Sequence, residues 1–396
     1  MKTIYKLVTL LLKLLSYFLV IKIGELETRS VGHYSKSIDI FLSEKKIFPS
    51  KKVTLEIWFT NNFVANHFLL NKWREKLFIL PNNKIINQLF FGFYTFLRKN
   101  SLKNFLVSYR DHRDTINWQI RDIHNVLKNS KQNFRFSEKE IQEGEELLQK
   151  IIPNYNDKTK LISIHCRDDA YVAGIRGTTV DYGNNFRRVN IKNFIKGIAS
   201  ANKEDYFVLK VGNYSSEETI LDTKQYNFID YSFSKYKSDF LDLYLAYRSS
   251  LYLGSDSGIV CFPGLFRKPM MMHNVCNVSV LNDFNDSTCA LVNFKKIYSK
   301  KFKRLITFSE NISLNIASFK DEDFISNQLE VIETGEDEIE EFVKECIWID
   351  NKKNDKYFNC ELQAKTRNLM ISLGVSNMGD IRVSPSFLSK YQDLIR

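Results

Sequence analysis

Residues 251–272 read LYLGSDSGIVCFPGLFRKPMMM, and this stretch decides the fold. Leu251–Gly254 is a short apolar run typical of a buried strand, and Ile259–Leu265 reads as a helix. Pro269–Met272 then predicts the next strand. A strand, a helix and a strand in this order form the unit from which parallel sheets are built. The segment therefore predicts an α/β protein.

The same alternation occurs on both sides of Pro153, where the amphipathic helix that opens with the capping-box pattern Ser137-x-x-Glu140 ends. The further expected strands are Leu19–Ile23, Val53–Thr60, Leu77–Leu80, Leu161–His165, Tyr206–Val211 and Phe228–Tyr231. The expected helices between them are Ser35–Ser43, Phe63–Lys76, Lys84–Lys99, Ile191–Ala201 and Ser238–Ser249. This order predicts two doubly wound domains that face a central cleft. We expect domains at 1–153 and 154–330, with a helical segment, 331–396, packing back across them.

Composition narrows the class of protein and of partner. The 396 residues include 57 Lys and Arg against 46 Asp and Glu, a net charge of +11, which favours anionic partners. The six cysteines form no C-x-x-C pair, so we expect reduced thiols in a cytoplasmic protein. Neither a P-loop motif nor a G-x-G-x-x-G fingerprint is present. The basic residues are scattered among acidic ones, so we expect no nucleic-acid partner.

The first 18 residues predict an amphipathic helix. Lys2, Lys6, Thr9, Lys13 and Ser16 share one stripe of the helical wheel. The opposite face is apolar, with Ile4, Leu7, Val8, Leu11, Leu14, Leu15 and Phe18. The run is too short and too interrupted by lysine for a membrane span or a signal peptide. Two interpretations stay open: a peripheral anchor on an anionic membrane surface, or a helix docked on its own domain.

The turn Ser255-Asp256-Ser257-Gly258 is the first candidate for a binding site. It links a strand directly to a helix, and the start of a helix offers free N–H groups and the positive end of a dipole to a phosphate. Asp256 would not itself face a phosphate; we expect it to cap the helix or to orient a neighbouring group. A plain, well-capped turn is the alternative.

The second candidate is His165-Cys166-Arg167-Asp168-Asp169, at the end of an expected strand. Ligands of open α/β sheets bind beyond the carboxyl ends of strands, where Arg167 could pair with a phosphate. His165 is a ligand contact or a core residue. The following loop carries Arg176, Asp181, Tyr182, Arg187 and Arg188, which form either a solvated loop or a loop that closes on substrate.

Two further positions complete the candidate site. His33 follows Gly32 at the start of an expected helix, where an imidazole can serve as a general base or merely cap the helix. Lys210 lies in the run VLKVG, 208–212, near the end of an expected strand, and would bring a cation to the cleft together with Gly212.

Taken together, these segments resemble a family of bacterial glycosyltransferases from surface-polysaccharide gene clusters. The matching stretches are ETRSVGHYS, IHCRDDAY, VLKVG, YSFSKYKSDFLDLYLA, GSDSGIVCFPGLFRKP, RLITFSE, ELQAKTRNLM and VSPSFLSKY, spread over nearly the whole chain. The DSG…RKP run is also similar to the phosphate loop of heptosyltransferases, and His165-x-Arg167 to a motif of several fucosyltransferases. The resemblance implies the GT-B fold, two Rossmann-like halves with the nucleotide sugar held mainly by the second. It departs from the family at Lys210, where arginine is usual, and around Arg187–Asn190.

The leading hypothesis is therefore transfer of a sugar from a nucleotide-sugar donor to a glycan or lipid-linked acceptor in surface-polysaccharide synthesis. We expect no metal and no cofactor, and an inverting displacement with His33 as base and Asp168 or Asp169 in reserve. The expected donor contacts are Arg167, Arg187, Lys210, Gly212, Ser255, Asp256, Ser257 and Gly258. The alternative is a membrane-associated, non-catalytic protein that binds nucleotides or anions or serves as a scaffold. We expect a cytoplasmic protein, peripheral on the inner face of the plasma membrane if the first helix anchors it.

Overall fold

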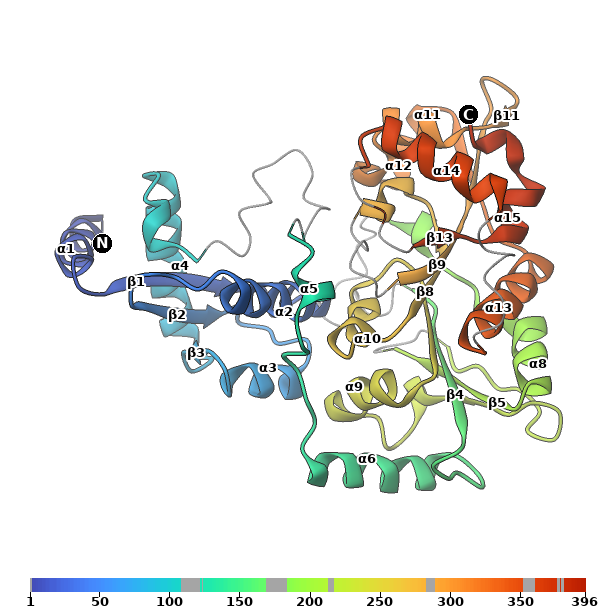
Figure 1. Cartoon of the computed structure of the whole chain (residues 1–396), viewed down its shortest axis with the longest axis horizontal. Coiled ribbons are helices and arrows are strands. Elements are labelled where there is room, and N and C mark those ends of the chain that lie inside the picture. The colour runs from blue at the N-terminus through green and yellow to red at the C-terminus, as the bar shows by residue number, and fades with distance from the viewer. Residues whose placement is uncertain are drawn as a thin grey trace. The chain divides into compact units, whose positions relative to one another are not determined.

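A computed structural model of the chain describes residues 2–107, 122, 124–168, 184–212, 217–282, 289–351, 360–375, 378 and 381–396. The chain divides into two compact units, Met1–Arg135 and Phe136–Arg396 (Figure 1). The expected α/β class is confirmed, because each unit is built on a parallel sheet flanked by helices.

The first unit holds a three-stranded parallel sheet in the order β1-β2-β3. Its strands are β1 (Val20–Leu26), β2 (Thr54–Thr60) and β3 (Phe78–Ile79). Its helices are α1 (Lys2–Leu15), α2 (Val31–Ile47), α3 (His67–Arg74), α4 (Lys84–Lys99) and the short α5 (Val126–Asn129). The expected strands and the helix Lys84–Lys99 are confirmed, with β1 extending three residues further than expected and α2 beginning at Val31.

Both faces of this sheet are covered. On one face Trp58 of β2 is fully buried and meets the ring of Phe41 on α2 edge-on, with 5.1 Å between ring centroids. On the other face Phe59 packs with Phe93 and Leu97 of α4 in one buried cluster. Gly24 of β1 lies against the Trp58 ring, where a Cβ would come within 2.6 Å of a ring carbon, so glycine is needed for this packing.

The first helix docks on its own unit by a narrow face. Tyr5 and Leu12 join the cluster around α4, and Thr9 is buried, its hydroxyl donating to the Tyr5 carbonyl at 2.8 Å. Thr9, on the same stripe of the helical wheel as the lysines, therefore faces the unit and satisfies its hydroxyl within the helix. The docked interpretation holds, yet the apolar face opposite remains exposed.

The second unit is built on a seven-stranded, all-parallel sheet in the order β13-β9-β8-β7-β4-β5-β6. These strands are β4 (Lys160–His165), β5 (Tyr206–Val211), β6 (Phe228–Asp230), β7 (Leu251–Gly254), β8 (Met270–Val275), β9 (Cys289–Phe294) and β13 (Arg382–Val383). The chain runs outward from β4 through β5 and β6, then returns to place β7 on the other side of β4. The sheet therefore has its topological switch point between β4 and β7.

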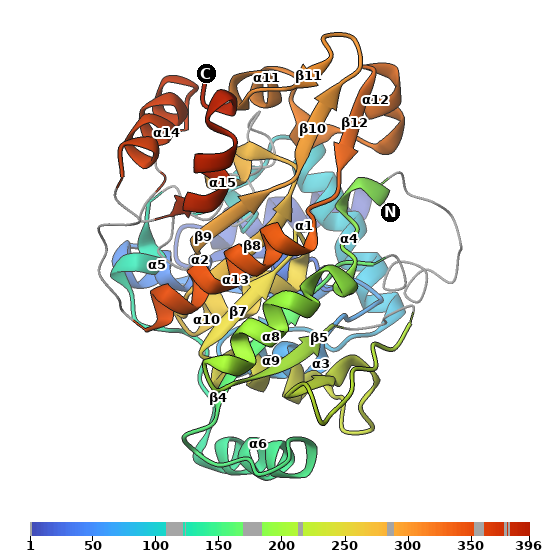
Figure 2. The same cartoon turned by 90° about the vertical axis from the view of Figure 1, so that its right-hand side faces the viewer.

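Helices cover both faces of the large sheet. The helices are α6 (Glu138–Ile151), α8 (Ile195–Lys203), α9 (Asp239–Arg248), α10 (Phe262–Leu265), α13 (Glu336–Asp350), α14 (Glu361–Ser372) and α15 (Pro385–Lys390). Figure 2 shows α8 and α13 side by side across one face, and their packing is close enough for Gly197 to contact Val343. Helices α9 and α10 lie on the other face.

A small antiparallel sheet, β11-β10-β12, extends from the second unit. Its strands are β10 (Lys296–Ser299), β11 (Arg304–Leu305) and β12 (Leu329–Ile332), and two short helices, α11 (Phe308–Ser313) and α12 (Asp321–Ser326), lie between the last two. None of these elements, nor β9 or β13, is among those expected from the sequence.

Two expected boundaries differ from those observed. The units divide after Arg135 rather than at Pro153, since α6 packs on α9 through Gly144 and the Tyr244 ring. The 331–396 segment, expected as helices that pack back across the domains, belongs to the second unit: α13 covers the sheet and β13 adds its edge strand next to β9.

No helix in the described ranges is long and apolar enough to cross a membrane. Among the described residues, Cys166, Cys261, Cys276, Cys346 and Cys360 take part in no disulfide.

Candidate anion site at the switch point

The switch point brings the two main candidate segments together. β4 and β7 are parallel neighbours with His165 opposite Gly254, so the residues that follow them emerge side by side. The Ser255 N–H donates to the His165 carbonyl at 3.1 Å, and the Ser255 hydroxyl accepts from the Arg167 N–H at 2.9 Å. Ser255 is fully buried, so its role in the structure is to join the two turns.

Two arginines converge beyond this junction. Nη1 of Arg167 and Nη2 of Arg187 both donate to the carbonyl oxygen of Asp256, at 3.2 and 2.7 Å. The Asp256 carboxylate pairs with Arg187 at 2.9 Å. Asp256 thus orients a neighbouring group, which is one of the two roles expected for it. The Nε atoms of Arg167 and Arg187 are buried and have no hydrogen-bond partner among the described residues.

The electrostatics of the pair favour an anion. Burial, together with the adjacent Arg187 charge, lowers the pKa of Arg167 to about 10, while Asp256 and Asp168 act in the opposite direction. Arg167 therefore stays protonated at neutral pH despite its burial. Two like charges held together with unused donors form a site that a phosphate or carboxylate would stabilise by charge-assisted hydrogen bonds.

The turn that carries Arg187 is stabilised by residues that were not among those predicted from the sequence. This turn is the 3₁₀ segment Asn185–Arg187. The Asp321 carboxylate accepts from its first two N–H groups at 3.0 and 3.1 Å. The buried ammonium of Lys295 donates to the carbonyls of Phe186 and Arg188, at 3.1 and 2.6 Å, and pairs with Glu333 at 2.6 Å. Lys295 directly follows β9, so recognising that strand would have drawn attention to it.

Lys210 is buried and engaged elsewhere. Its Nζ pairs with Asp230 at 2.7 Å and donates to the Thr219 hydroxyl and the Glu217 carbonyl, each at 3.3 Å. The geometry therefore favours a role in holding segment 217–219 at the end of β5, and direct contact of Lys210 with a donor remains a prediction.

His165 and Gly212 meet at the end of the strand pair β4–β5. The His165 Nδ1 lies 3.2 Å from the Val211 carbonyl, which can only accept, so Nδ1 carries the proton and Nε2 is a bare acceptor. A Cβ at Gly212 would lie 3.3 Å from this ring nitrogen, so the glycine permits the close approach. Burial lowers the pKa of His165 to about 4, and the ring is neutral at physiological pH.

The expected helix at Ile259–Leu265 is replaced by two shorter turns. A 3₁₀ turn, Gly258–Cys261, leads into α10, and the Ser257 side chain makes no cap hydrogen bond. Ser257 and Gly258 are partly exposed beside the arginines. A single 3₁₀ turn has a weaker aligned dipole than a long helix, so the arginines supply most of the positive charge here.

The remaining candidates are more dispersed. His33 is half-buried in the first turn of α2, at the carboxyl end of β1, and its backbone N–H donates to the Ser30 carbonyl at 2.9 Å. His33 and the arginine pair belong to different units, so a shared cleft remains a prediction. Asp168 is partly buried beside Arg167. Four positions lie outside the described residues: Asp169, Arg176, Asp181 and Tyr182.

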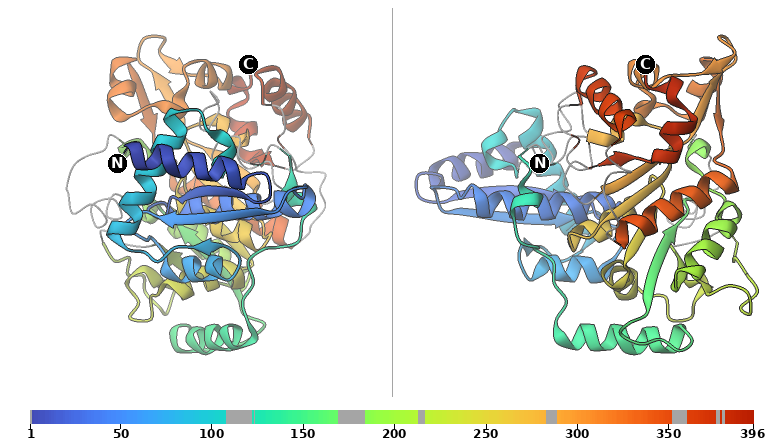
Figure 3. Two further views of the ribbon diagram at one scale, coloured as in Figure 1. Left: turned by 90° about the vertical axis from the view of Figure 1, so that its left-hand side faces the viewer. Right: turned by 45° about the vertical axis from the view of Figure 1, so that its right-hand side comes forward.

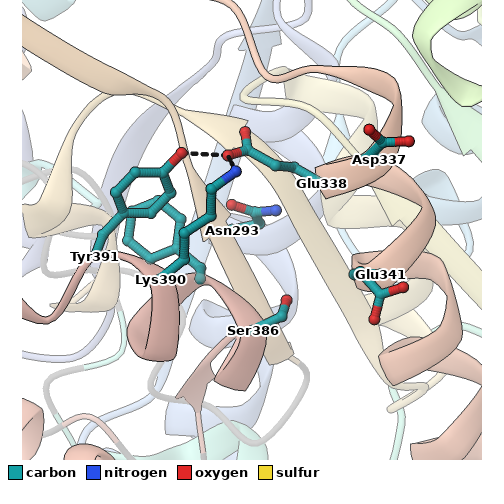
Figure 4. Close-up of a pocket in the computed structure, with 8 residues that line it drawn as sticks. Asn293, Asp337, Glu338, Glu341, Ser386, Lys390 and Tyr391 are labelled. Atoms are coloured by element: carbon teal, nitrogen blue, oxygen red, sulfur yellow. Dashed lines mark hydrogen bonds and ion pairs between the residues drawn. The ribbon is translucent and has the colours of Figure 1, made fainter.

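A pocket elsewhere in the second unit has the opposite character. It lies between α13 and α15, with a volume of about 120 Å³ (Figure 4). Its lining includes the carboxylates of Asp337, Glu338 and Glu341, with Lys390 as the one lysine. Glu338 is held by Lys390 at 2.8 Å and by the hydroxyl of Tyr391. This acidic lining does not suit an anionic ligand.

Comparison with known proteins gives limited matches. No family model matches the chain, and no curated protein sequence matches it. Among solved structures, the chain is similar to ADP-heptose lipopolysaccharide heptosyltransferase II of E. coli, with 11% identity, a TM-score of 0.40, and coverage of 70% of this chain and 90% of that chain. A family 9 glycosyl transferase of Veillonella parvula matches with 11% identity and a TM-score of 0.39, covering 78% of this chain and 96% of that chain. The wall teichoic acid polymerase TagF gives 10% identity and a TM-score of 0.27, covering 67% and 72%. At TM-scores of 0.40 and less, these likenesses carry no inference about function.

Proposed function

We propose that the chain is a glycosyltransferase of GT-B type that holds the diphosphate of a nucleotide-sugar donor at Arg167 and Arg187. The observation that carries the proposal is the convergence of the two guanidinium groups on one carbonyl oxygen, with both Nε atoms buried and unused by the described residues. Their position at the β4/β7 switch point is where open α/β sheets bind nucleotides. That the bound nucleotide carries a sugar is inferred from the sequence resemblance to glycosyltransferases.

The chemistry that suits this site is stabilisation of a leaving group. When the bond between the anomeric carbon and the diphosphate breaks, negative charge grows on the phosphate oxygens. Fixed positive groups aimed at that charge lower the barrier. In the proposed reaction, Arg167 and Arg187 supply the positive charge without a metal ion, and the acceptor is a glycan or a lipid-linked saccharide.

The acceptor hydroxyl must lose a proton as it attacks. His33 is the proposed base and Asp168 the alternative, and attack from the face opposite the leaving group makes the transfer inverting. Asp168 lies beside Arg167, where its carboxylate also supports the arginine charge.

A donor screen with the full chain tests the proposal. UDP-, GDP-, CMP-, ADP- and dTDP-sugars are each assayed for binding by thermal shift and for release of the free nucleotide over time. We expect one class of donor to stabilise the protein and to be slowly hydrolysed. Binding without any turnover, including with candidate acceptors, would support the non-catalytic alternative, and absence of binding by every donor would reject the nucleotide-sugar site.

A further inference from the structure

The first helix presents an apolar surface that its own unit does not cover. Ile4, Leu7, Leu11 and Leu14 project from one side of α1, and each is between 56% and 63% exposed. Phe18, just past the end of the helix, is 88% exposed. Folding should bury such residues unless they serve another contact, because a contiguous exposed apolar surface is uncommon in soluble proteins.

The helix that carries this surface is fixed by its packing against α4. The Tyr5 ring lies 5.5 Å from the Phe93 ring and 5.6 Å from the Phe96 ring of α4, measured between centroids. Opposite Tyr5, α4 carries Gly92, where a Cβ would come within 2.5 Å of the Tyr5 hydroxyl oxygen. The residues that dock α1 are therefore different from those that remain exposed. Figure 3 shows α1 at the periphery of its own unit, beside α4.

The segments that carry this apolar face and pack behind it have charge of one sign. Residues 1–24 contain four lysines and no acidic residue, and Lys2, Lys6 and Lys13 of α1 are exposed. Residues 76–107, which include α4, also contain no acidic residue and carry Lys76, Lys84, Arg98, Lys99 and Lys103. Two apolar residues of α4, Ile85 and Leu89, are also exposed.

We propose that this surface, the exposed face of α1 with the adjoining part of α4, docks on an anionic lipid bilayer. The leucine side chains would enter the boundary between headgroups and acyl chains, while the long lysine side chains on the other side of α1 and on α4 reach up to the lipid phosphates. A second copy of the chain is a poor occupant, since two surfaces that both carry only positive charge would repel each other. The inference is independent of the proposed sugar transfer.

Co-sedimentation of the full chain with vesicles tests the docking. One set of vesicles is pure phosphatidylcholine, and the other contains about a third phosphatidylglycerol, a composition chosen for this test. We expect binding to the anionic vesicles that weakens as salt is raised. The double variant Leu7→Glu/Leu11→Glu should lower the partition coefficient at least about a hundredfold. The variant Lys2→Gln/Lys6→Gln/Lys13→Gln should lower it on the order of a hundredfold on anionic vesicles only.

A matched control comes from exposed apolar residues elsewhere. Ile220→Glu and Ile325→Glu change residues that are 82% and 76% exposed in the second unit, and both variants should bind vesicles like the unchanged chain. Because Leu7 and Leu11 face solvent, their variant should unfold at the same temperature as these controls. The proposal is overturned if the unchanged chain does not sediment with anionic vesicles, or if the leucine variant binds as well as the controls. It is also overturned if the unchanged chain is a dimer that the leucine variant dissociates.

Discussion

At Asp256 a single carbonyl oxygen accepts hydrogen bonds from two guanidinium groups, with one carboxylate nearby to balance them. Such a pair is costly to hold together, and the structure meets that cost with further buried contacts: Ser255 fixes the Arg167 backbone, and Lys295 fixes the turn of Arg187. A site maintained by this many supporting contacts is pre-organised, so little rearrangement is needed when an anion arrives.

The role of His33 can be separated from donor binding. General-base assistance contributes about 10²–10⁴-fold to a rate, so His33→Ala should lower turnover by that factor. Donor affinity, measured by calorimetry on the same preparation, should stay nearly unchanged because the proposed donor contacts lie in the other unit. A fall in donor affinity would instead make His33 a substrate contact. Unchanged turnover would move the role of base to Asp168 or Asp169.

A buried carboxyl on α9 should make stability depend on pH. Burial raises the pKa of Asp242 to about 7, and no described residue bonds to its Oδ1. Between about pH 4 and 7 the folded state therefore holds a proton that the unfolded state releases. This contribution to stability is fully present below the unfolded pKa and is lost as pH rises through 7.

The corresponding test is denaturant unfolding across this pH range. In the unchanged chain, the free energy of unfolding should fall by up to a few kcal/mol between pH 4 and pH 7 because of Asp242. In the Asp242→Asn variant this fall should be absent. Identical pH profiles for the two proteins would show that Asp242 ionises normally in the folded state.

At the scale of elements, one glycine of α6, Gly144, allows this helix to pack closely against α9. A Cβ at Gly144 would lie 2.4 Å from the Tyr244 ring, whose hydroxyl donates to Glu145 at 2.6 Å. Gly144→Ala should therefore destabilise the second unit by about 1–3 kcal/mol, although alanine favours an isolated helix. Gly335→Ala is the control, since nothing lies within 4 Å of a Cβ there. Equal unfolding midpoints for the two variants would argue against the α6–α9 packing.

Local signals predicted elements well where one signal dominated. The capping box at Ser137 and Glu140 forms as expected at the start of α6, and Lys84–Lys99 is helical from end to end. By contrast, β9 and β13 become strands because the growing sheet offers partners, which is a tertiary effect that no local pattern carries. The Gly258–Cys261 turn is 3₁₀ where a helix was expected, and Pro263, two residues after it, has no N–H to donate back to this turn.

The sequence predicted some residues of the candidate site, but not their arrangement, which depends on tertiary structure. The expectation that strand ends carry the ligand site drew attention to Arg167 and Ser255. Which strand ends are neighbours depends on the order of strands in the sheet, and that order puts β7 beside β4. The partners of Lys210 and the support from Lys295 could not be anticipated, because Asp230, Glu333 and the turn at 185–187 are distant in sequence from the lysines they meet.

At the scale of the whole molecule, the proposed donor site lies within one unit. Arg167, Arg187 and the turn 255–258 all belong to Phe136–Arg396, which has its own sheet and buried clusters. A protein comprising residues 136–396 should therefore fold alone and bind the donor nucleotide within about threefold of the full chain, but without turnover, since it lacks His33. Calorimetry and circular dichroism check this. A folded fragment that does not bind would place essential donor contacts in the first unit.

The most direct measurement is a calorimetric titration of nucleoside diphosphates into the full chain and two variants, Arg167→Ala and Arg187→Ala. Each arginine should contribute charge-assisted hydrogen bonds, so each variant should bind about 10- to 100-fold more weakly. The control is Arg304→Ala, an exposed arginine of the same unit that pairs with Glu310, and it should bind like the unchanged chain. Folded variants of Arg167 and Arg187 that bind as tightly as the Arg304 control would contradict the switch-point anion site.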